Sequence, residues 1–148
     1  DNTINIDRVF YNNNLLRMSF MHIIENNLEV VEYENLLLPI SIKIRELIQY
    51  ENKRALCHWH DDIEIIKILS GSMNFYINGE IFHLIKDDIL IVNSKQIHYG
   101  YEYNHDDCKF ICLMVNPSVL KINKAMYREY VIPIIENNGL MACCLKNN

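Results

Sequence analysis

Glycine, proline and tryptophan are scarce in this chain of 148 residues, which has four glycines, three prolines and one tryptophan. Collagen-like and low-complexity sequences are rich in glycine or proline, and disordered ones are poor in hydrophobic residues, so none of these classes fits. Half of the residues are hydrophobic, and a chain of this length buries roughly two thirds of its unfolded surface on folding. We therefore expect a single compact domain over residues 1–148.

The chain also lacks a basic surface. Its formal net charge is -5, and the basic residues Lys121, Lys124 and Arg128 are too sparse to form a nucleic-acid footprint. No hydrophobic run approaches the roughly 18 residues of a membrane helix, and the first ten residues do not resemble a signal peptide. The five cysteines include no C-x-x-C pair, which favours free thiols in a reducing cytoplasm.

Short β-strand patterns are frequent in the sequence. From about residue 40 onward, apolar and β-branched runs alternate with turn residues at intervals of roughly 8–12 residues, a spacing typical of an all-β sandwich or barrel. Asn78-Gly79 is a strong hairpin signal, and Gly71 is expected to end the strand that begins at residue 63. The predicted strands cover residues 41–47, 63–69, 73–77, 80–85, 89–92, 97–103 and 108–115.

The pattern changes after Asn116. Asn-Pro at 116–117 is a good helix start, with a capping residue followed by proline at the first helical position. We expect one short helix that ends by Pro133 and a last strand within residues 140–145. The first 36 residues fit a helix and a strand equally well.

His58, His60, Glu64 and His98 are the candidate functional residues. Side chains alternate across a strand, so His58, His60 and Glu64 project to one side, and a neighbouring strand that begins near His98 can deliver a third imidazole. Three imidazoles and a carboxylate suit a first-row divalent metal such as Zn, Ni, Mn or Fe. Two alternatives stay open: these residues line a ligand pocket without a metal, or they catalyse a reaction.

The spacing of these residues resembles the two motifs of the cupin family. His58-x-His60-x-x-x-Glu64, followed by Gly71, is similar to the first motif, and His98 stands where the second motif supplies its histidine. Over residues 40–135 the sequence resembles the sensor domain of AraC-type transcription regulators. The resemblance implies a mainly β fold, a cupin double-stranded β-helix (a jelly-roll barrel) with a short C-terminal helix. Residues 1–36 would form an N-terminal arm, 37–116 the barrel, and 117–148 the helix and last strand.

The sequence departs from the cupin motifs at several turns. Glycine, proline and asparagine are usual at these positions, where this chain has other residues. Asparagine and aspartate also form turns, so the fold prediction stands. The departures could instead change the position in which His98 is held relative to a metal. The residues concerned are Asn52, Asp87, Asn93, Lys95 and Glu102.

The resemblance also implies a function. A small-molecule effector, a sugar or another small metabolite, would bind in the barrel at His58, His60, Glu64 and His98, which would also hold any divalent metal. No catalytic residue is assigned. DNA would be contacted through a helix-turn-helix domain that this chain does not contain, so we expect a fragment of a longer cytoplasmic protein, without membrane contact and able to form a homodimer. The rival hypotheses are a stand-alone metal-dependent cupin enzyme, an isomerase or dioxygenase, and a carbohydrate-binding module.

Overall fold

The computed structural model describes residues 21 and 23–147. This part of the chain forms seven strands, followed or interrupted by short helical segments. The strands are β1 (Ile40–Glu46), β2 (Ile63–Ile77), β3 (Glu80–Ile85), β4 (Ile89–Val92), β5 (His98–Glu102), β6 (Cys108–Val115) and β7 (Ala142–Leu145). The helical segments are η1 (Glu25–Asn27), η2 (Leu47–Gln49), η3 (Glu51–Lys53), η4 (Pro117–Ile122), α2 (Lys124–Met126), η5 (Tyr127–Val131) and α3 (Ile132–Ile135).

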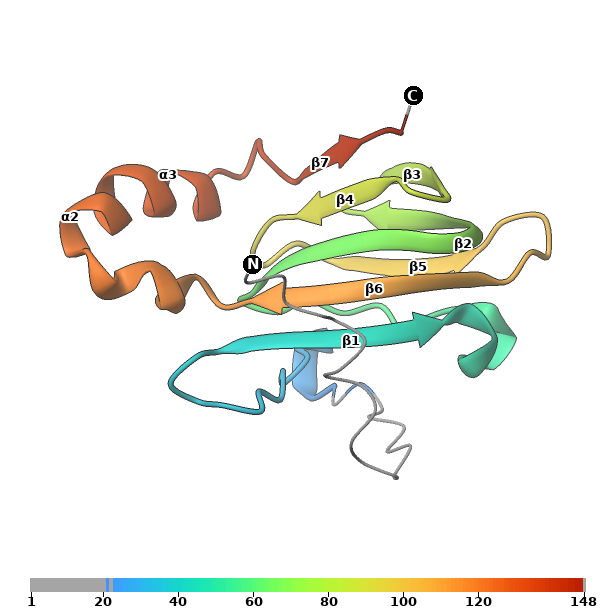
Figure 1. Ribbon diagram of the computed structural model, residues 1–148, viewed down its shortest axis with the longest axis horizontal. Helices are drawn as coiled ribbons and strands as arrows, with labels where there is room; N and C mark the ends of the chain where they lie inside the picture. Colours follow the sequence, from blue (N-terminus) through green and yellow to red (C-terminus); the bar gives the residue numbers. More distant parts are fainter. Residues whose placement is uncertain (1–20, 22, 148) are drawn as a thin grey trace, which may run out of the picture.

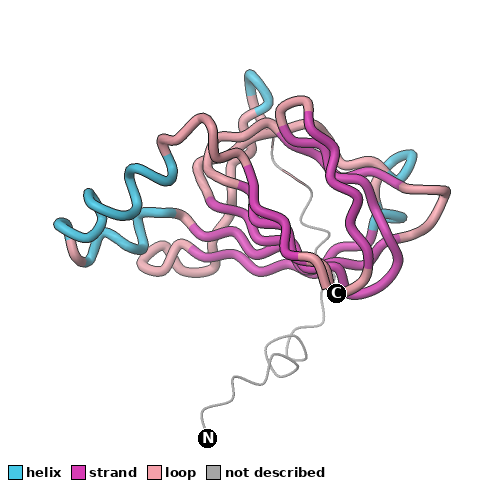
Figure 2. The backbone as a smooth tube through the Cα atoms, turned by 90° about the horizontal axis from the view of Figure 1, so that it is seen from above, coloured by secondary structure: helices cyan, strands magenta, loops and turns pink. Residues whose placement is uncertain are grey.

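The long strand β2 organises the sheet. Strands follow the order β1-β6-β2-β4-β7, and β3 and β5 also pair with β2. The N-terminal half of β2 lies between β6 and β4, and its C-terminal half lies between β3 and β5; all of these pairs are antiparallel. The strands therefore curl around a common interior, while the helical segments after β6 project to one side (Figures 1 and 2). The mainly β prediction is confirmed.

Gly71 does not end a strand, contrary to the prediction from sequence. β2 continues through it, with a register shift against β6 between Ile68 and Ser70. Gly71 has φ +73°, and a Cβ atom there would lie 1.9 Å from the backbone oxygen of Asp107. Because glycine alone combines easy positive φ with the absence of Cβ, this residue lets one strand bend from the first half of the barrel into the second.

Alternating residues of the strands fill the interior. On β2, Ile66 and Ile68 are fully buried before the bend, and Met73 and Ile77 are fully buried after it. Burying one large apolar side chain contributes about 1.5–3 kcal/mol. Phe75 of β2 and buried residues of the other elements complete the core: Leu47, Leu84, Leu90, Val92, Cys108, Phe110, Cys112 and Met114.

The C-terminal region begins as predicted. The Asn116 side chain accepts a hydrogen bond from the Ser118 N–H, with Pro117 at the start of η4. After α3 the chain returns as β7, which pairs with β4 and confirms the predicted last strand. Here Asp88, fully buried, accepts a hydrogen bond from the Lys146 ammonium at 2.7 Å. No helix within residues 21 and 23–147 has the length and apolar composition needed to cross a membrane.

We predict that Gly71→Ala destabilises the protein far more than Gly79→Ala. A methyl group at residue 71 would collide with the backbone of Asp107, whereas a Cβ at residue 79 meets nothing within 4 Å, although φ is positive at both. The expected loss in free energy of unfolding is about 4 kcal/mol for Gly71→Ala and about 1 kcal/mol for Gly79→Ala, measured by urea denaturation. Equal losses would contradict the role given to the bend.

Candidate metal centre and ligand cavity

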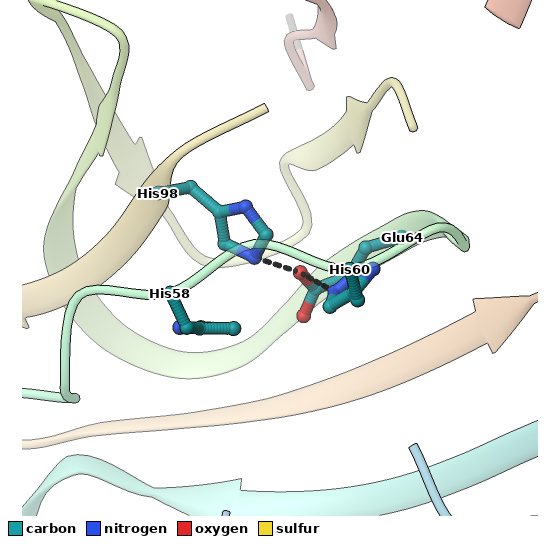
Figure 3. A group of neighbouring side chains, drawn as sticks. All are labelled: His58, His60, Glu64 and His98. Carbon is teal, nitrogen blue, oxygen red and sulfur yellow. Dashed lines mark ion pairs between the residues drawn. The ribbon is translucent and has the colours of Figure 1, made fainter. Parts of the chain in front are cut away.

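The four histidine and glutamate residues singled out in the sequence come together inside the barrel. His58 and His60 lie in the extended segment before β2, Glu64 lies on β2, and His98 begins β5. All four are buried, and one ligand atom of each lies within 4.8 Å of the others (Figure 3). The backbones of His58 and His98 exchange two hydrogen bonds, of 3.1 and 2.9 Å. The structure thus brings together every residue of the predicted site.

Backbone carbonyl groups fix the orientation of the three imidazole rings. Each Nδ1 lies within hydrogen-bond distance of a carbonyl oxygen two residues away: Leu56 for His58 (2.8 Å), Asp62 for His60 (3.1 Å) and Gln96 for His98 (2.8 Å). A carbonyl oxygen can only accept a hydrogen bond, so Nδ1 carries the proton in each ring. In a neutral ring, Nε2 is then left with its lone pair. Rings that bind metals are commonly held in this way.

Glu64 lies between the rings. Its Oε2 is 2.7 Å from Nε2 of His98 and 3.4 Å from Nε2 of His60 (Figure 3). Its Oε1 is 2.7 Å from Sγ of Cys112, whose thiol donates to it. Burial raises the pKa of Glu64, but the charge of His98 and the contacts with His60 outweigh burial and hold the pKa well below its usual range. Glu64 is therefore a carboxylate.

The same contacts change the pKa of the neighbouring groups. For His60, burial lowers the pKa, but the Glu64 carboxylate outweighs it and the pKa is raised. Burial raises the pKa of the Cys112 thiol well above its usual range, and the nearby charge of Glu64 raises it further. In the metal-free protein, the charged Glu64 thus favours protonation of His60 and keeps the proton on Cys112.

His58 faces a different carboxylate. Its Nε2 lies 3.5 Å from Oε2 of Glu29, and both side chains are buried. Burial, followed by the charge of His98, lowers the pKa of His58 to about 3, so its ring is neutral near pH 7. Burial raises the pKa of Glu29.

An N-terminal segment brings Glu29 to the site. Residues 26–29 run beside Trp59: the Glu29 N–H donates to the Trp59 oxygen (2.8 Å), and the Trp59 N–H donates to the Asn27 oxygen (2.9 Å). The Trp59 ring N–H also donates to the Asn26 oxygen, at 2.7 Å. The predicted N-terminal arm, residues 1–36, falls largely on residues 1–20 and 22, which lie outside the described residues. Its described part contributes a carboxylate to the cluster.

Three atoms at the centre of the cluster are buried without a well-directed hydrogen bond among the described residues. They are His60 Nε2, Glu64 Oε2 and His98 Nε2. The 2.7 Å contact between Glu64 and His98 is an ion pair by distance, but its direction does not satisfy both atoms. Buried polar atoms without partners are costly and need an explanation. A cation shared between them would satisfy all three, and the donor set suits a first-row divalent metal.

A cavity adjoins the cluster. His58 and Glu64 form part of its wall, so a molecule in the cavity would touch two of the four cluster residues. The rest of the wall is partly polar and partly apolar. It consists of Met21, Glu29, Lys43, Arg45, Tyr50, Ala55, Phe75, Gly100, Phe110, Cys112 and Met114.

The turns that depart from the cupin motifs keep the backbone conformation of glycine. Asn52, Asp87 and Lys95 stand where the motifs have glycine, and their φ angles are +52°, +70° and +65°. A left-handed conformation costs a non-glycine residue on the order of 1 kcal/mol, which the surrounding structure overcomes. Asn93 ties its turn to the C-terminal region, donating to the backbone oxygens of Ile134 and Leu140. The altered turns therefore do not displace His98 from the cluster.

Similar proteins have the same architecture. A cupin 2 conserved barrel domain protein from Salinispora arenicola aligns with a TM-score of 0.50 at 10% identity, covering 62% of this chain and 76% of that one. The Cnp3 cupin domain of Schizosaccharomyces pombe aligns with a TM-score of 0.50 at 13% identity, covering 65% and 67%. Together with the sheet order, these likenesses define the fold as a cupin double-stranded β-helix, as predicted.

The sequence comparisons identify the family. Residues 47–125 match the model of the AraC-like ligand binding domain, and the chain belongs to that family. It is also 32% identical over 127 residues to YdeC of Bacillus subtilis (strain 168), named as an uncharacterised HTH-type transcriptional regulator. The match covers 85% of this chain and 43% of YdeC. The chain thus spans less than half the length of this relative.

Several residues of the site were not predicted from the sequence. Glu29 gave no signal, because its strand-like segment has no distinctive motif. Cys112 could have been placed at the site from the sequence, because side chains alternate along β6 and Cys112 falls on its inner face. Lys43 and Arg45 could also have been noticed, because residues 42–45 alternate isoleucine with cations, and one of the two sets must face the interior.

We predict that the ring of His58 stays neutral down to about pH 5 in the metal-free protein. The unfolded chain has a histidine pKa of about 6.5, whereas burial lowers that of His58 to about 3. The folded state therefore binds fewer protons here, so the stability contributed by His58 is complete above pH 6.5 and is lost as the pH falls towards 3. The measurement is the proton NMR shift of its Cε1–H, assigned with His58→Gln. A titration centred near pH 6.5 would contradict the account.

Proposed function

We propose that this chain is the effector-sensing domain of an AraC-type transcription regulator. The observation that carries the proposal is the cavity beside the buried cluster of His58, His60, Glu64 and His98, in a chain of the AraC-like ligand-binding family. The effector, a sugar or another small metabolite, binds in this cavity and contacts the cluster. Residues 1–148 act as one sensor domain, in the cytoplasm, and DNA is contacted by a helix-turn-helix domain elsewhere in the full-length regulator.

The cluster holds a divalent cation in this proposal. His58, His60 and His98 provide Nε2 atoms and Glu64 provides Oε2; the orientation of the rings and the three unsatisfied atoms support the assignment. Zn, Ni, Mn and Fe all suit such donors. A bound cation would supply a fixed positive charge and an electrophilic contact for the effector. Metal uptake requires His60 to lose its proton, so the affinity for metal falls as the pH falls.

Two elements next to the barrel carry the signal in this proposal. A ligand changes a regulator only through a difference in affinity between two states. The N-terminal segment around Glu29 touches both His58 and the cavity, so its position depends on what the cavity contains. The helical region from η4 to α3 hydrogen-bonds to the turn before β5 through Asn93 and Ile134, and provides a route towards a partner subunit in a homodimer.

A metal-dependent cupin enzyme is the second candidate, because the cluster of three histidines and one glutamate also suits catalysis with an open metal position. The two functions differ in what happens to the bound molecule. A sensor releases its effector unchanged after altering DNA binding, whereas an isomerase or dioxygenase converts it.

We predict that molecules that bind the barrel change the DNA affinity of the full-length regulator. Compounds from a metabolite library that raise the midpoint of thermal unfolding of this chain are tested for DNA affinity with the full-length protein on the DNA upstream of its gene. An allosteric coupling of 1–3 kcal/mol corresponds to a change of about fivefold or more. Glu64→Ala should abolish the change, whereas His83→Ala, at an exposed ring, should preserve it.

Two results would contradict the proposal. If the compounds bind the barrel but DNA affinity stays the same, the domain does not sense them. If mass spectrometry shows that they are converted to products, the chain is an enzyme.

A further inference from the structure

The middle of β1 turns the half-buried Lys43 and Arg45 towards the barrel interior and Ile42 and Ile44 outward. Ile42 and Ile44 are 53% and 38% exposed, while Lys43 and Arg45 line the cavity. The register agrees, because Lys43 pairs with Cys112 and Arg45 pairs with Phe110, and both partners are buried on the inner face of β6. Two isoleucines on the outside and two cations on the inside reverse the arrangement that the hydrophobic effect favours. The reversal therefore indicates that the cations have a task in the interior.

The cavity wall contains both cationic and apolar side chains. Lys43 and Arg45 are the cations of the wall and Glu29 and Glu64 its carboxylates, whereas Phe75, Phe110 and Met114 have apolar side chains. Lys43 and Arg45 have interactions of their own within the protein, so a ligand would join or replace existing contacts. A molecule that complements both kinds of side chain has an anionic group and an apolar body.

The charges around the cavity balance only when no metal is bound and every histidine is neutral, and a proton on His60 already adds one positive charge. Lys43 and Arg45 together carry two positive charges, and Glu29 and Glu64 carry two negative charges when ionised, so the wall is formally neutral with neutral histidines. A divalent cation in the cluster would leave two positive charges in excess. In an interior of low dielectric constant, such an excess strongly favours an anion at the same place.

We propose that the cavity binds a small organic anion, with its carboxylate towards Lys43 and Arg45 and its apolar body against Phe75, Phe110 and Met114, and that a cation in the cluster strengthens this binding. The inference rests on the proposed function and narrows the effector from any small metabolite to a carboxylate. A neutral sugar is the competing ligand class.

Butyrate and butyramide form a matched pair of probes, because they have nearly the same shape and differ in charge. Binding to the metal-loaded chain is followed through the NMR signals of the methionine methyl groups, of which that of Met114 lines the cavity. We expect butyrate to bind at least about tenfold more tightly than butyramide, since a charge-assisted pair in the interior contributes more than about 1.4 kcal/mol. Removing the metal with EDTA should weaken butyrate binding by a similar factor.

Substitutions on β1 test the site itself. Lys43→Met and Arg45→Met should each weaken butyrate binding about tenfold, whereas Lys43→Arg and Arg45→Lys, which keep the charge, should retain most of it. Lys109→Met is the matched control: it removes a positive charge from the neighbouring strand, where Lys109 pairs with Glu46 at 3.0 Å and is 45% exposed. It should bind butyrate as the wild type does.

The inference is wrong if butyramide binds as tightly as butyrate, if the methionine substitutions on β1 leave binding unchanged, or if the wild type does not bind butyrate. The link to the metal is wrong if EDTA has no effect on butyrate binding. Metal analysis of the same samples separates this inference from the proposed function. A chain that holds a metal and binds an uncharged metabolite would remain a sensor with a neutral effector, whereas a chain with neither metal nor ligand would contradict both.

Discussion

The pair of backbone hydrogen bonds between His58 and His98 is the interaction on which the site depends. It joins the segment before β2 to the first residue of β5, two parts of the chain that are forty residues apart, and so sets the positions of three imidazole rings at once. The carbonyl groups next to each ring then fix the proton on Nδ1. They turn Nε2 of His60 and His98 towards Glu64, and Nε2 of His58 towards Glu29. Because these partners belong to the backbone, the orientation does not depend on any further side chain.

The sequence predicted much of this arrangement because its signals are local. Alternation of side chains along a strand places His58, His60 and Glu64 on one side, and the Asn78-Gly79 hairpin fixes how β2 and β3 pair. The order of strands and turns, and the cupin motifs, were enough to bring His98 to the same point. The helix start at Asn116-Pro117 could also be predicted from the sequence, because a helix cap depends only on neighbouring residues.

The remaining features depend on contacts between distant residues. That Gly71 bends β2 follows from the carbonyl group of Asp107, which lies far along the chain. Glu29 reaches the cluster because residues 26–29 pair with Trp59. No sequence motif predicts this contact. Alternation along β1 allows two orientations, with either the cations Lys43 and Arg45 or the neighbouring isoleucines facing the interior. The hydrophobic effect alone would place the isoleucines inside. Such reversals of a general rule are found where function requires them.

A metal centre beside a ligand cavity would give a mainly apolar barrel a reason to contain so many ionisable groups. Buried charges persist when they are paired or bind a metal. Here two carboxylates, two cations and the ring of His58 line one cavity, and the rings of His60 and His98 belong to the adjoining cluster. A metal in the cluster and an anion in the cavity would balance the charges around it. Each of the two would then bind more tightly when the other is present. The N-terminal segment, through Glu29, would respond to both.

The most direct test of the central claim is a crystal of the chain grown with zinc, with diffraction data collected on both sides of the zinc absorption edge. We expect one strong anomalous peak among the side chains of His58, His60, Glu64 and His98, and we expect it to be lost in His98→Ala. A barrel without such a peak, or with zinc bound only at surface residues, would show that the four side chains line the cavity without holding a metal.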